Sequence, residues 1–229
     1  MLRGLADKKR THRMGNCRHR LLVVRAVVGN GLASALGLTW LMPIPVLIIA
    51  ARSSAGVAFI VAVASWFLGS LNMWCFFRTV LDVPLLAVLA FLILPACFFG
   101  LGVLLFRQWV RGGKPAAAAV GFAAFWVTYE YLLAMSSIHS TFGNLAYSQM
   151  NFLPILQIAS LTGIWGISFC MVLFAATVAV LCSGYGNSRE KRVLAAGVAV
   201  FLLAVFGFGE WRLRAPQGAE CVSVGIAGL

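Results

Sequence analysis

Long apolar runs fill most of the chain and are separated by short turns that hold the charged residues. A helix needs about 20 apolar residues to cross a bilayer, and runs near that length recur along the sequence. Seven membrane segments are expected, at residues 21–37, 38–51, 54–77, 83–106, 115–136, 158–183 and 193–209. The pattern predicts an all-α polytopic membrane helix bundle over residues 21–209. It excludes a soluble domain and a single cleaved signal peptide.

The first two expected segments are less distinct than the others. They form one apolar stretch that is interrupted by Asn30-Gly31 and by Met42-Pro43-Ile44-Pro45. Each proline lacks a backbone N–H, so neighbouring protein must compensate the unpaired carbonyl inside a bilayer. This stretch predicts either a helical hairpin with a tight turn or one span followed by a re-entrant piece.

Charge is distributed unevenly between alternate turns. Only 10% of the residues are charged, and the net charge is +12. Seven basic residues lie in an arm at residues 1–20, and the other expected cytoplasmic ones are Arg52, Arg107, Arg111, Lys114, Arg189, Lys191 and Arg192. The opposite side holds Arg78, Arg212 and Arg214. The positive-inside rule therefore predicts a cytoplasmic N-terminus and an extracytoplasmic C-terminal end. Topology and attraction to anionic lipid explain this charge, so no nucleic-acid partner is expected.

Residues that could ligate a metal are scattered. The six cysteines form no CxxC pair, and His12, His19 and His139 lie far apart in the sequence. The cysteines are typical of small buried apolar side chains. We expect no metal site and no cofactor.

Glu130 is the one acidic residue well inside an expected span. An ionisable group is costly within a bilayer, which makes Glu130 a candidate functional residue. The structural alternative is a carboxyl group that packs helices together through a neighbour such as Tyr129 or Arg78.

A charge-free but polar segment at residues 136–157 joins two of the apolar runs. Its hydroxyl, amide and imidazole groups could hold a lipid headgroup or carbonyl by hydrogen bonds, although an ordinary outer loop that caps two helices is the alternative. The candidate lipid- or substrate-facing residues are Glu130, His139, Phe142, Asn144, Tyr147, Gln149 and Gln157.

The composition changes after Gly209. Residues 210–220 are polar and turn-prone, and residues 221–229 alternate in polarity like a β-strand. A lone strand has nothing to pair with. We therefore expect residues 210–229 to be a linker and the start of a truncated extracytoplasmic domain.

The order of several motifs resembles the apolipoprotein N-acyltransferase family. These are Trp126-Val127-Thr128-Tyr129-Glu130, then Tyr147-Ser148-Gln149, then Leu156-Gln157-Ile158-Ala159-Ser160, then Gly163-Ile164-Trp165-Gly166-Ile167-Ser168-Phe169. The resemblance implies seven spans before a nitrilase-like α/β domain, whose first strand would be residues 222–228. The chain departs from the family where a Phe-Pro-Trp sequence is replaced by Ser140-Thr141-Phe142.

The resemblance also implies a location in the bacterial cytoplasmic (inner) membrane and an activity. Enzymes of this family transfer an acyl chain from phospholipid, through a cysteine thioester, to the N-terminal cysteine of lipoproteins. Their catalytic Glu, Lys and Cys lie further along the nitrilase-like domain, so no catalytic residue is expected here, and neither Glu220 nor Cys221 matches one. Expected partners of the monomeric chain are a phospholipid acyl donor, a lipoprotein acceptor and membrane lipids.

Two other functions fit the same sequence. One is a small polytopic transporter or lipid-binding membrane scaffold, in which Glu130 and the polar segment would line a pathway. The other is an anchoring module whose soluble partner is a separate polypeptide.

Overall fold

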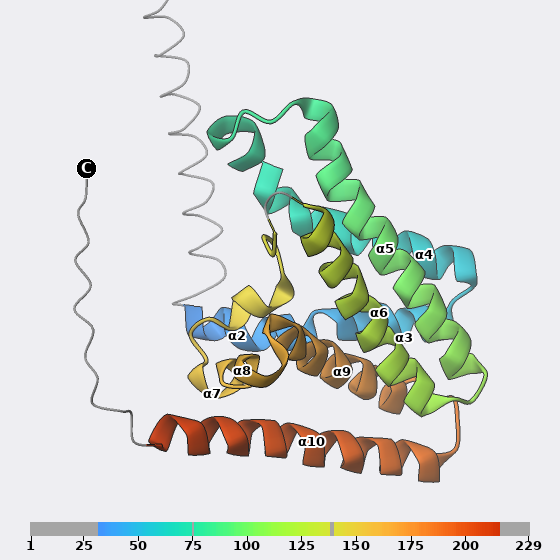
Figure 1. Ribbon diagram of the computed structural model, residues 1–229. Coiled ribbons are helices and arrows are strands. Elements are labelled where there is room, and N and C mark those ends of the chain that lie inside the picture. Colours follow the sequence, from blue (N-terminus) through green and yellow to red (C-terminus); the bar gives the residue numbers. More distant parts are fainter. Residues whose placement is uncertain (1–31, 75, 138–139, 216–229) are drawn as a thin grey trace, which may run out of the picture.

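The computed structural model describes residues 32–74, 76–137 and 140–215, and these residues form helices and turns without any strand (Figure 1). The longer helices are α2 (Leu32–Leu41), α3 (Pro43–Arg52), α4 (Ala55–Ser70), α5 (Leu85–Arg111), α6 (Pro115–Ser136), α9 (Ile164–Cys182) and α10 (Ser188–Arg214). The short ones are η1 (Leu71–Met73), η2 (Phe76–Val80), η3 (Leu145–Gln149), α7 (Leu153–Leu156) and α8 (Ala159–Thr162). The predicted all-α class is confirmed for this part of the chain.

Helices α5, α6, α9 and α10 are long and apolar enough to cross a membrane. Shorter apolar helices cover Gly37–Arg52, Ala55–Ser70 and Leu153–Thr162. The expected total of seven spans therefore stays a prediction. The basic arm, most of the first expected span and the expected strand at 221–229 lie outside the described residues.

The boundary expected between the first two spans, near residue 38, is wrong. Helix α2 continues through it, and Met42 keeps helical angles (φ −53°, ψ −42°) between α2 and α3. The Met42 N–H still donates to the Leu38 carbonyl at 2.9 Å. Pro43 and Pro45 lie in the first turn of α3, where a missing N–H costs little. The prolines therefore leave residues 32–52 helical and make no hairpin turn.

Two other expected spans are interrupted. Helix α4 stops at Ser70, whose hydroxyl donates to the Trp66 carbonyl, and a 3₁₀ turn and the π-helical η2 follow. The expected span at 158–183 breaks at Gly163, where φ is +64°. Glycine adopts this left-handed conformation without the steric cost that a Cβ imposes. Hydropathy continues across both breaks, so it did not reveal them.

Small side chains allow the helices to approach closely. Helix α4 packs along α5, and α6 packs along α9. Each of these four helices, and α3 as well, carries alanines that are almost completely buried. They are Ala50, Ala51, Ala58, Ala62, Ala96, Ala118, Ala119, Ala123, Ala175, Ala176 and Ala179. Phe106 and Phe122 fill the space between α5 and α6, with ring centroids 5.8 Å apart. Small residues at interfaces with large rings between them are typical of membrane helix packing.

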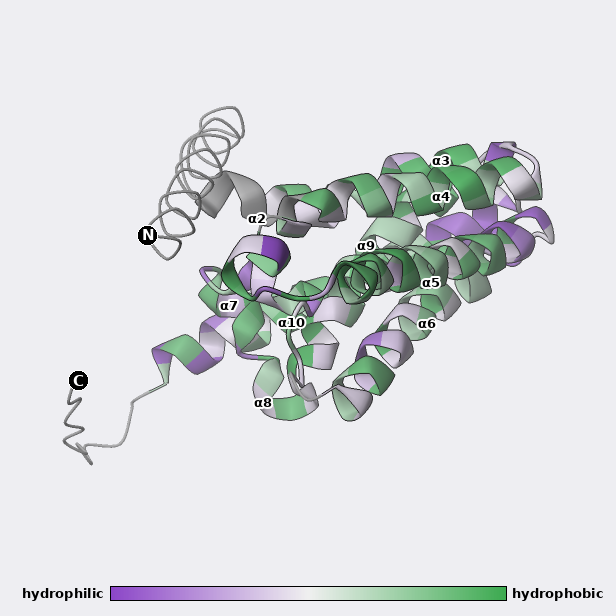
Figure 2. Cartoon of the chain, turned by 90° about the horizontal axis from the view of Figure 1, so that it is seen from above, coloured by the Kyte–Doolittle hydropathy of each residue, from purple (hydrophilic) through white to green (hydrophobic). Residues whose placement is uncertain are grey.

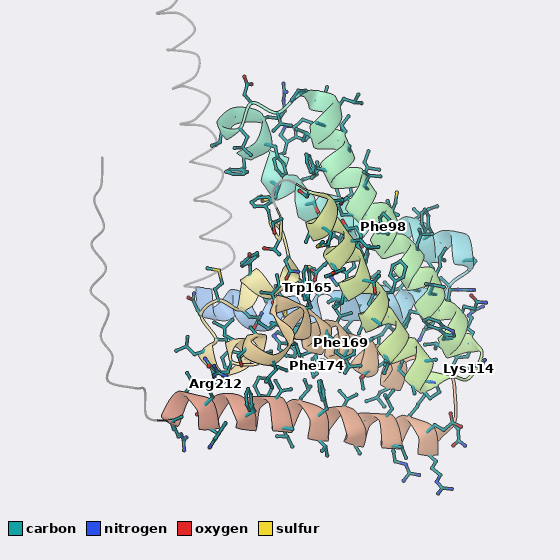
Figure 3. All side chains as sticks on the ribbon, viewed as in Figure 1. Phe98, Lys114, Trp165, Phe169, Phe174 and Arg212 are labelled. Atoms are coloured by element: carbon teal, nitrogen blue, oxygen red, sulfur yellow. The ribbon has the colours of Figure 1, made fainter. Side chains whose placement is uncertain are left out.

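The turns that follow α3, α5 and α9 meet at one end of the bundle. Hydrophilic residues gather there, at the ends of α3 and α5 (Figure 2). Lys114 lies at this end and Arg212 lies at the other (Figure 3). Helices α4, α5 and α6 alternate in direction, so the end of α4, the start of α5 and the end of α6 all lie away from the basic turns (Figure 1).

Candidate functional site

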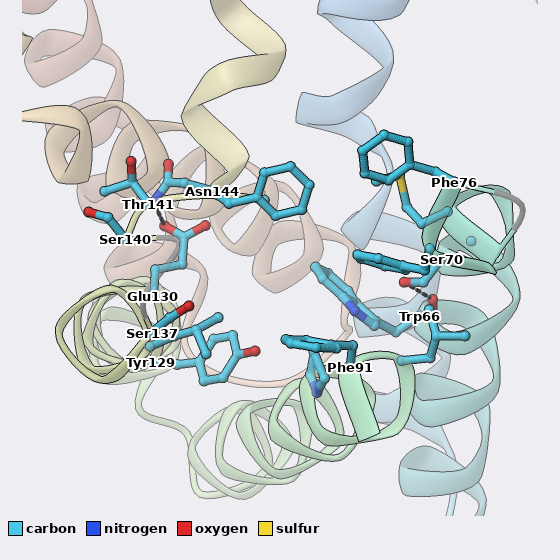
Figure 4. Close-up of a pocket in the computed structure, with 18 of the residues that line it drawn as sticks. Trp66, Ser70, Phe76, Phe91, Tyr129, Glu130, Ser137, Ser140, Thr141 and Asn144 are labelled. Atoms are coloured by element: carbon cyan, nitrogen blue, oxygen red, sulfur yellow. Dashed lines mark hydrogen bonds between the residues drawn. The ribbon is translucent and has the colours of Figure 1, made fainter. Parts of the chain in front are cut away.

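A cavity of about 550 Å³ lies where α4 ends, α5 begins and α6 ends (Figure 4). One wall is apolar and consists mainly of Trp66, Met73, Phe76, Phe77, Phe91, Leu92, Pro95 and Trp126. The other wall carries polar side chains, namely Tyr129, Glu130, Ser137, Ser140, Thr141 and Asn144. The cavity therefore combines the two kinds of surface that an amphipathic ligand requires.

Helical spacing explains the apolar wall. Trp66, Gly69, Ser70 and Met73 follow one another at intervals of three, one and three residues, so they lie on one side of α4 and its continuation. The Trp66 and Trp126 rings pack with centroids 4.6 Å apart. These contacts hold the wall in a fixed shape.

Aromatic rings from three segments lie together at the same cavity. Phe77 stacks on Phe91 of α5 with ring centroids 5.7 Å apart. Phe76 stacks on Phe142 of the polar segment at 6.5 Å. Phe142 is 51% exposed and lines the cavity. The Phe142 ring is therefore accessible from the cavity, and its contact with a lipid or substrate stays a prediction.

Glu130 holds the polar segment against α6. The Asn144 amide donates to its Oε2 at 2.9 Å, and the Leu145 backbone N–H donates to its Oε1 at 2.8 Å. Asn144 Oδ1 in turn accepts from the Ala146 N–H and from the Ser168 hydroxyl of α9. Glu130 is 6% exposed. These hydrogen bonds offset part of the cost of burying a carboxyl group.

The Glu130 carboxyl group binds Asn144 and Leu145 rather than either neighbour suggested by the sequence. The Arg78 guanidinium donates instead to the Val83 carbonyl at 2.8 Å. The one ion pair among the described residues joins Arg214 to Glu210 on the exposed side of α10. The expectation that Arg78 or Tyr129 binds this carboxyl group is wrong, because the chain between α6 and η3 folds back over it.

Gln149 belongs to a second polar cluster, which faces α2. Its side-chain amide donates to the Thr39 hydroxyl at 2.9 Å, and its carbonyl oxygen accepts from the Trp40 indole at 3.0 Å. Gln149 is 1% exposed and does not line the cavity. It joins the polar segment to α2 instead.

Tyr147 and Gln157 do not line the cavity. The Tyr147 hydroxyl lies 2.6 Å from the Thr141 hydroxyl, and Gln157 donates to the Leu153 carbonyl at 3.3 Å. His139 lies outside the described residues. The structure thus brings together Glu130, Phe142 and Asn144.

Sequence reasoning missed the aromatic wall and Ser168. The signal for the wall was the helical spacing of Trp66, Gly69 and Met73, which is equally typical of plain core packing. Ser168 lies inside the Trp-Gly-Ile-Ser motif, but nothing in the sequence connects it with Asn144.

Comparison with known proteins identifies the chain's relatives. The family model described as apolipoprotein N-acyltransferase N-terminal domain matches residues 33–177, which is more than half of the chain. The chain belongs to this family. The resemblance seen in its motifs is therefore confirmed, and the match includes every residue that lines the cavity.

The curated relatives are much longer than the matched region. Apolipoprotein N-acyltransferase of Pseudomonas putida is 35% identical over 130 residues, which cover 55% of this chain and 25% of the relative. That of Geobacter metallireducens is 28% identical over 122 residues, or 51% of this chain and 23% of the relative. The chain thus matches about a quarter of each relative's length. No solved structure gives a significant match.

Proposed function

We propose that the chain is the membrane part of an enzyme that transfers an acyl chain from phospholipid to the N-terminal cysteine of bacterial lipoproteins. Within it, the cavity between α4, α5 and α6 holds one acyl chain of the phospholipid donor. The observation that carries this proposal is the pairing of an aromatic wall with a wall of hydroxyl, amide and carboxyl groups in one cavity of about 550 Å³. Cavities of about 300–1,000 Å³ are typical of small-ligand sites.

The polar wall gives this cavity its selectivity. A lipid tail that leaves the bilayer gains little from an apolar wall, because the bilayer interior is equally apolar. The ester group of the lipid gains more, since the hydroxyls of Ser140 and Thr141 and the amide of Asn144 can donate hydrogen bonds to its carbonyl oxygen. The tail therefore lies along Trp66 and Phe91, and the ester lies near Asn144.

The chemical step belongs to residues beyond those in the cavity. A cysteine thiolate of a nitrilase-like domain attacks the ester carbonyl, forms an acyl thioester and releases the lysophospholipid. The amino group of the acceptor cysteine then takes the acyl chain, so one transfer is divided into two. The described residues position the donor and supply no nucleophile for this reaction.

We propose that the bundle has the orientation expected from the sequence. The basic turns face the cytoplasm, and the cavity lies near the outer face of the inner membrane. In this proposal the nitrilase-like domain follows α10, which continues to Arg214 rather than ending at the expected residue 209, and seven spans precede that domain. Arg52, Arg107 and Arg111 bind carbonyl groups at the ends of α3 and α9, and Lys114 lies at the same end of the bundle, away from the cavity. This distribution of basic residues supports the orientation.

Filling the cavity is expected to prevent lipid binding. Gly69 lines the cavity, and nothing lies within 4 Å of a Cβ built there. Gly69→Trp therefore places an indole in the space of the acyl chain without a backbone clash. We expect its affinity for a phospholipid with a pyrene-labelled tail to fall at least about tenfold, as measured by fluorescence titration of the purified chain.

Gly56→Trp is the matched control. Gly56 also lies in α4 with nothing within 4 Å of a built Cβ, but it does not line the cavity. The Gly56→Trp variant should bind the labelled lipid with the same affinity as the unsubstituted chain. Equal loss in both variants, or no loss in either, would show that the cavity does not take the acyl chain.

A further inference from the structure

Three arginines are fixed by backbone carbonyls at the end of the bundle opposite the cavity. Arg107 Nε donates to the Ser53 carbonyl at 2.9 Å, and Arg111 Nε donates to the Ala51 carbonyl at 3.0 Å. Arg52 donates through Nη2 to the Cys182 carbonyl at 2.8 Å. Two of the guanidinium groups are thus held at the end of α3, and the third joins the end of α3 to the end of α9.

These bonds leave the phosphate-binding edge of two guanidinium groups available. Arg107 and Arg111 use Nε, so the two terminal nitrogens of each side chain remain for another acceptor. That pair of nitrogens is the fork that binds two oxygens of a phosphate at once. Arg111 also lies over the Tyr185 ring, 5.6 Å from its centroid, which further restricts its position.

The positive charge at this end has no carboxylate partner among the described residues. The one ion pair of the described residues joins Arg214 to Glu210 on α10. Lys114 lies in the turn between α5 and α6 and adds positive charge at the same end. Glu190, in the first turn of α10, is the acidic residue of this end, and it is exposed. No carboxylate of the described residues therefore competes with an anion for these arginines.

Exposed apolar side chains occur in the helical turns on either side of the connection between α3 and α4. Ile49 of α3 and Val57 and Ile60 of α4 are each 45% exposed or more. In a bilayer we expect these apolar side chains to contact lipid tails and the arginines at the helix ends to lie at the level of the headgroups. A free anion would have no use for this apolar surface, whereas a phospholipid uses both parts.

We propose that Arg52, Arg107 and Arg111 form a binding site for the phosphate of an anionic phospholipid. The site is separate from the cavity and independent of the proposed acyl transfer. Control of topology requires only a number of positive charges in the turns. Fixed guanidinium forks beside an apolar surface add a defined geometry, as in basic sites between membrane helices that bind lipid headgroups.

Lipid titration of the full chain in neutral detergent tests this site. We expect phosphatidylglycerol to bind about tenfold more tightly than phosphatidylcholine, as measured by native mass spectrometry. The double substitution Arg107→Gln and Arg111→Gln should remove this preference. Arg212→Gln with Arg214→Gln removes the same charge at the other end and should leave the preference intact.

A conservative variant covers the case in which the glutamine variant does not fold. Arg107→Lys with Arg111→Lys keeps the charge but replaces each fork by a single ammonium, so the preference should fall several-fold. The proposal is overturned if the unsubstituted chain binds both lipids equally. It is also overturned if the lysine variant keeps the full preference, if the control at Arg212 and Arg214 loses it, or if inorganic phosphate competes as well as the lipid.

Discussion

Replacing Glu130 by alanine is expected to lower the free energy of unfolding by about 2–5 kcal/mol. The carboxyl group accepts from the Asn144 amide and from the Leu145 N–H, and all of these groups lie at a largely buried site. Alanine leaves both donors without an acceptor, and each buried unsatisfied donor costs about 1–3 kcal/mol. The polar segment should detach from α6. Thermal unfolding in detergent, together with protease sensitivity of residues 140–150, measures this effect.

Glu210 provides the control for that substitution. Its carboxylate pairs with Arg214 at 3.4 Å on the exposed side of α10. Exposed pairs of this kind contribute about 0–1 kcal/mol, so Glu210→Ala should barely change the unfolding temperature. If Glu130→Ala and Glu210→Ala unfolded at the same temperature, the Glu130 hydrogen bonds would have no role in holding the segment.

Substitution of Gly209 by alanine is expected to displace α10 from α7. A Cβ at this position would collide with the Pro154 carbonyl group, which is backbone and cannot rotate away. Overpacking of this kind costs about 1–3 kcal/mol. The displacement should also break the 2.7 Å hydrogen bond from Arg212 to the Ser160 hydroxyl. A lower unfolding temperature and a larger distance between spin labels on α7 and α10 would record it.

Gly207 lies two residues earlier in the same helix and has nothing within 4 Å of a built Cβ. Gly207→Ala should leave the unfolding temperature unchanged or raise it, since alanine is favoured over glycine inside a helix by about 0.5–1 kcal/mol. Equal behaviour of the two variants would mean that α10 does not pack closely on Pro154.

The apolar pattern predicted helix positions better than helix ends. The expected segment at 115–136 coincides with α6, because Pro115 begins it and the polar segment follows it directly. The end of α4 at Ser70 and the break at Gly163 were missed. Both breaks depend on backbone conformation and local hydrogen bonds, and the hydropathy of the surrounding residues does not change there.

The candidate site was predicted in part. Glu130 stood out because a carboxyl group inside a span is costly, and Asn144 stood out in a segment without charge. Their mutual hydrogen bond could not be predicted, because it depends on how the polar segment around Asn144 folds back onto α6. Gln149 looked like Asn144 in the sequence, yet it faces α2, since η3 turns the two side chains in different directions.

Photocrosslinking is the most direct test of whether the cavity holds an acyl chain. The protein is placed in lipid nanodiscs that contain a phospholipid with a diazirine at the end of one acyl chain. After irradiation, the labelled peptides of the protein are mapped. If the cavity holds the acyl chain, label appears at lining residues such as Met73, Phe91 and Leu133, and Gly69→Trp abolishes it while Gly56→Trp does not. Label confined to exposed residues on outer faces, such as Leu86 and Leu203, and unchanged by Gly69→Trp would contradict the proposal.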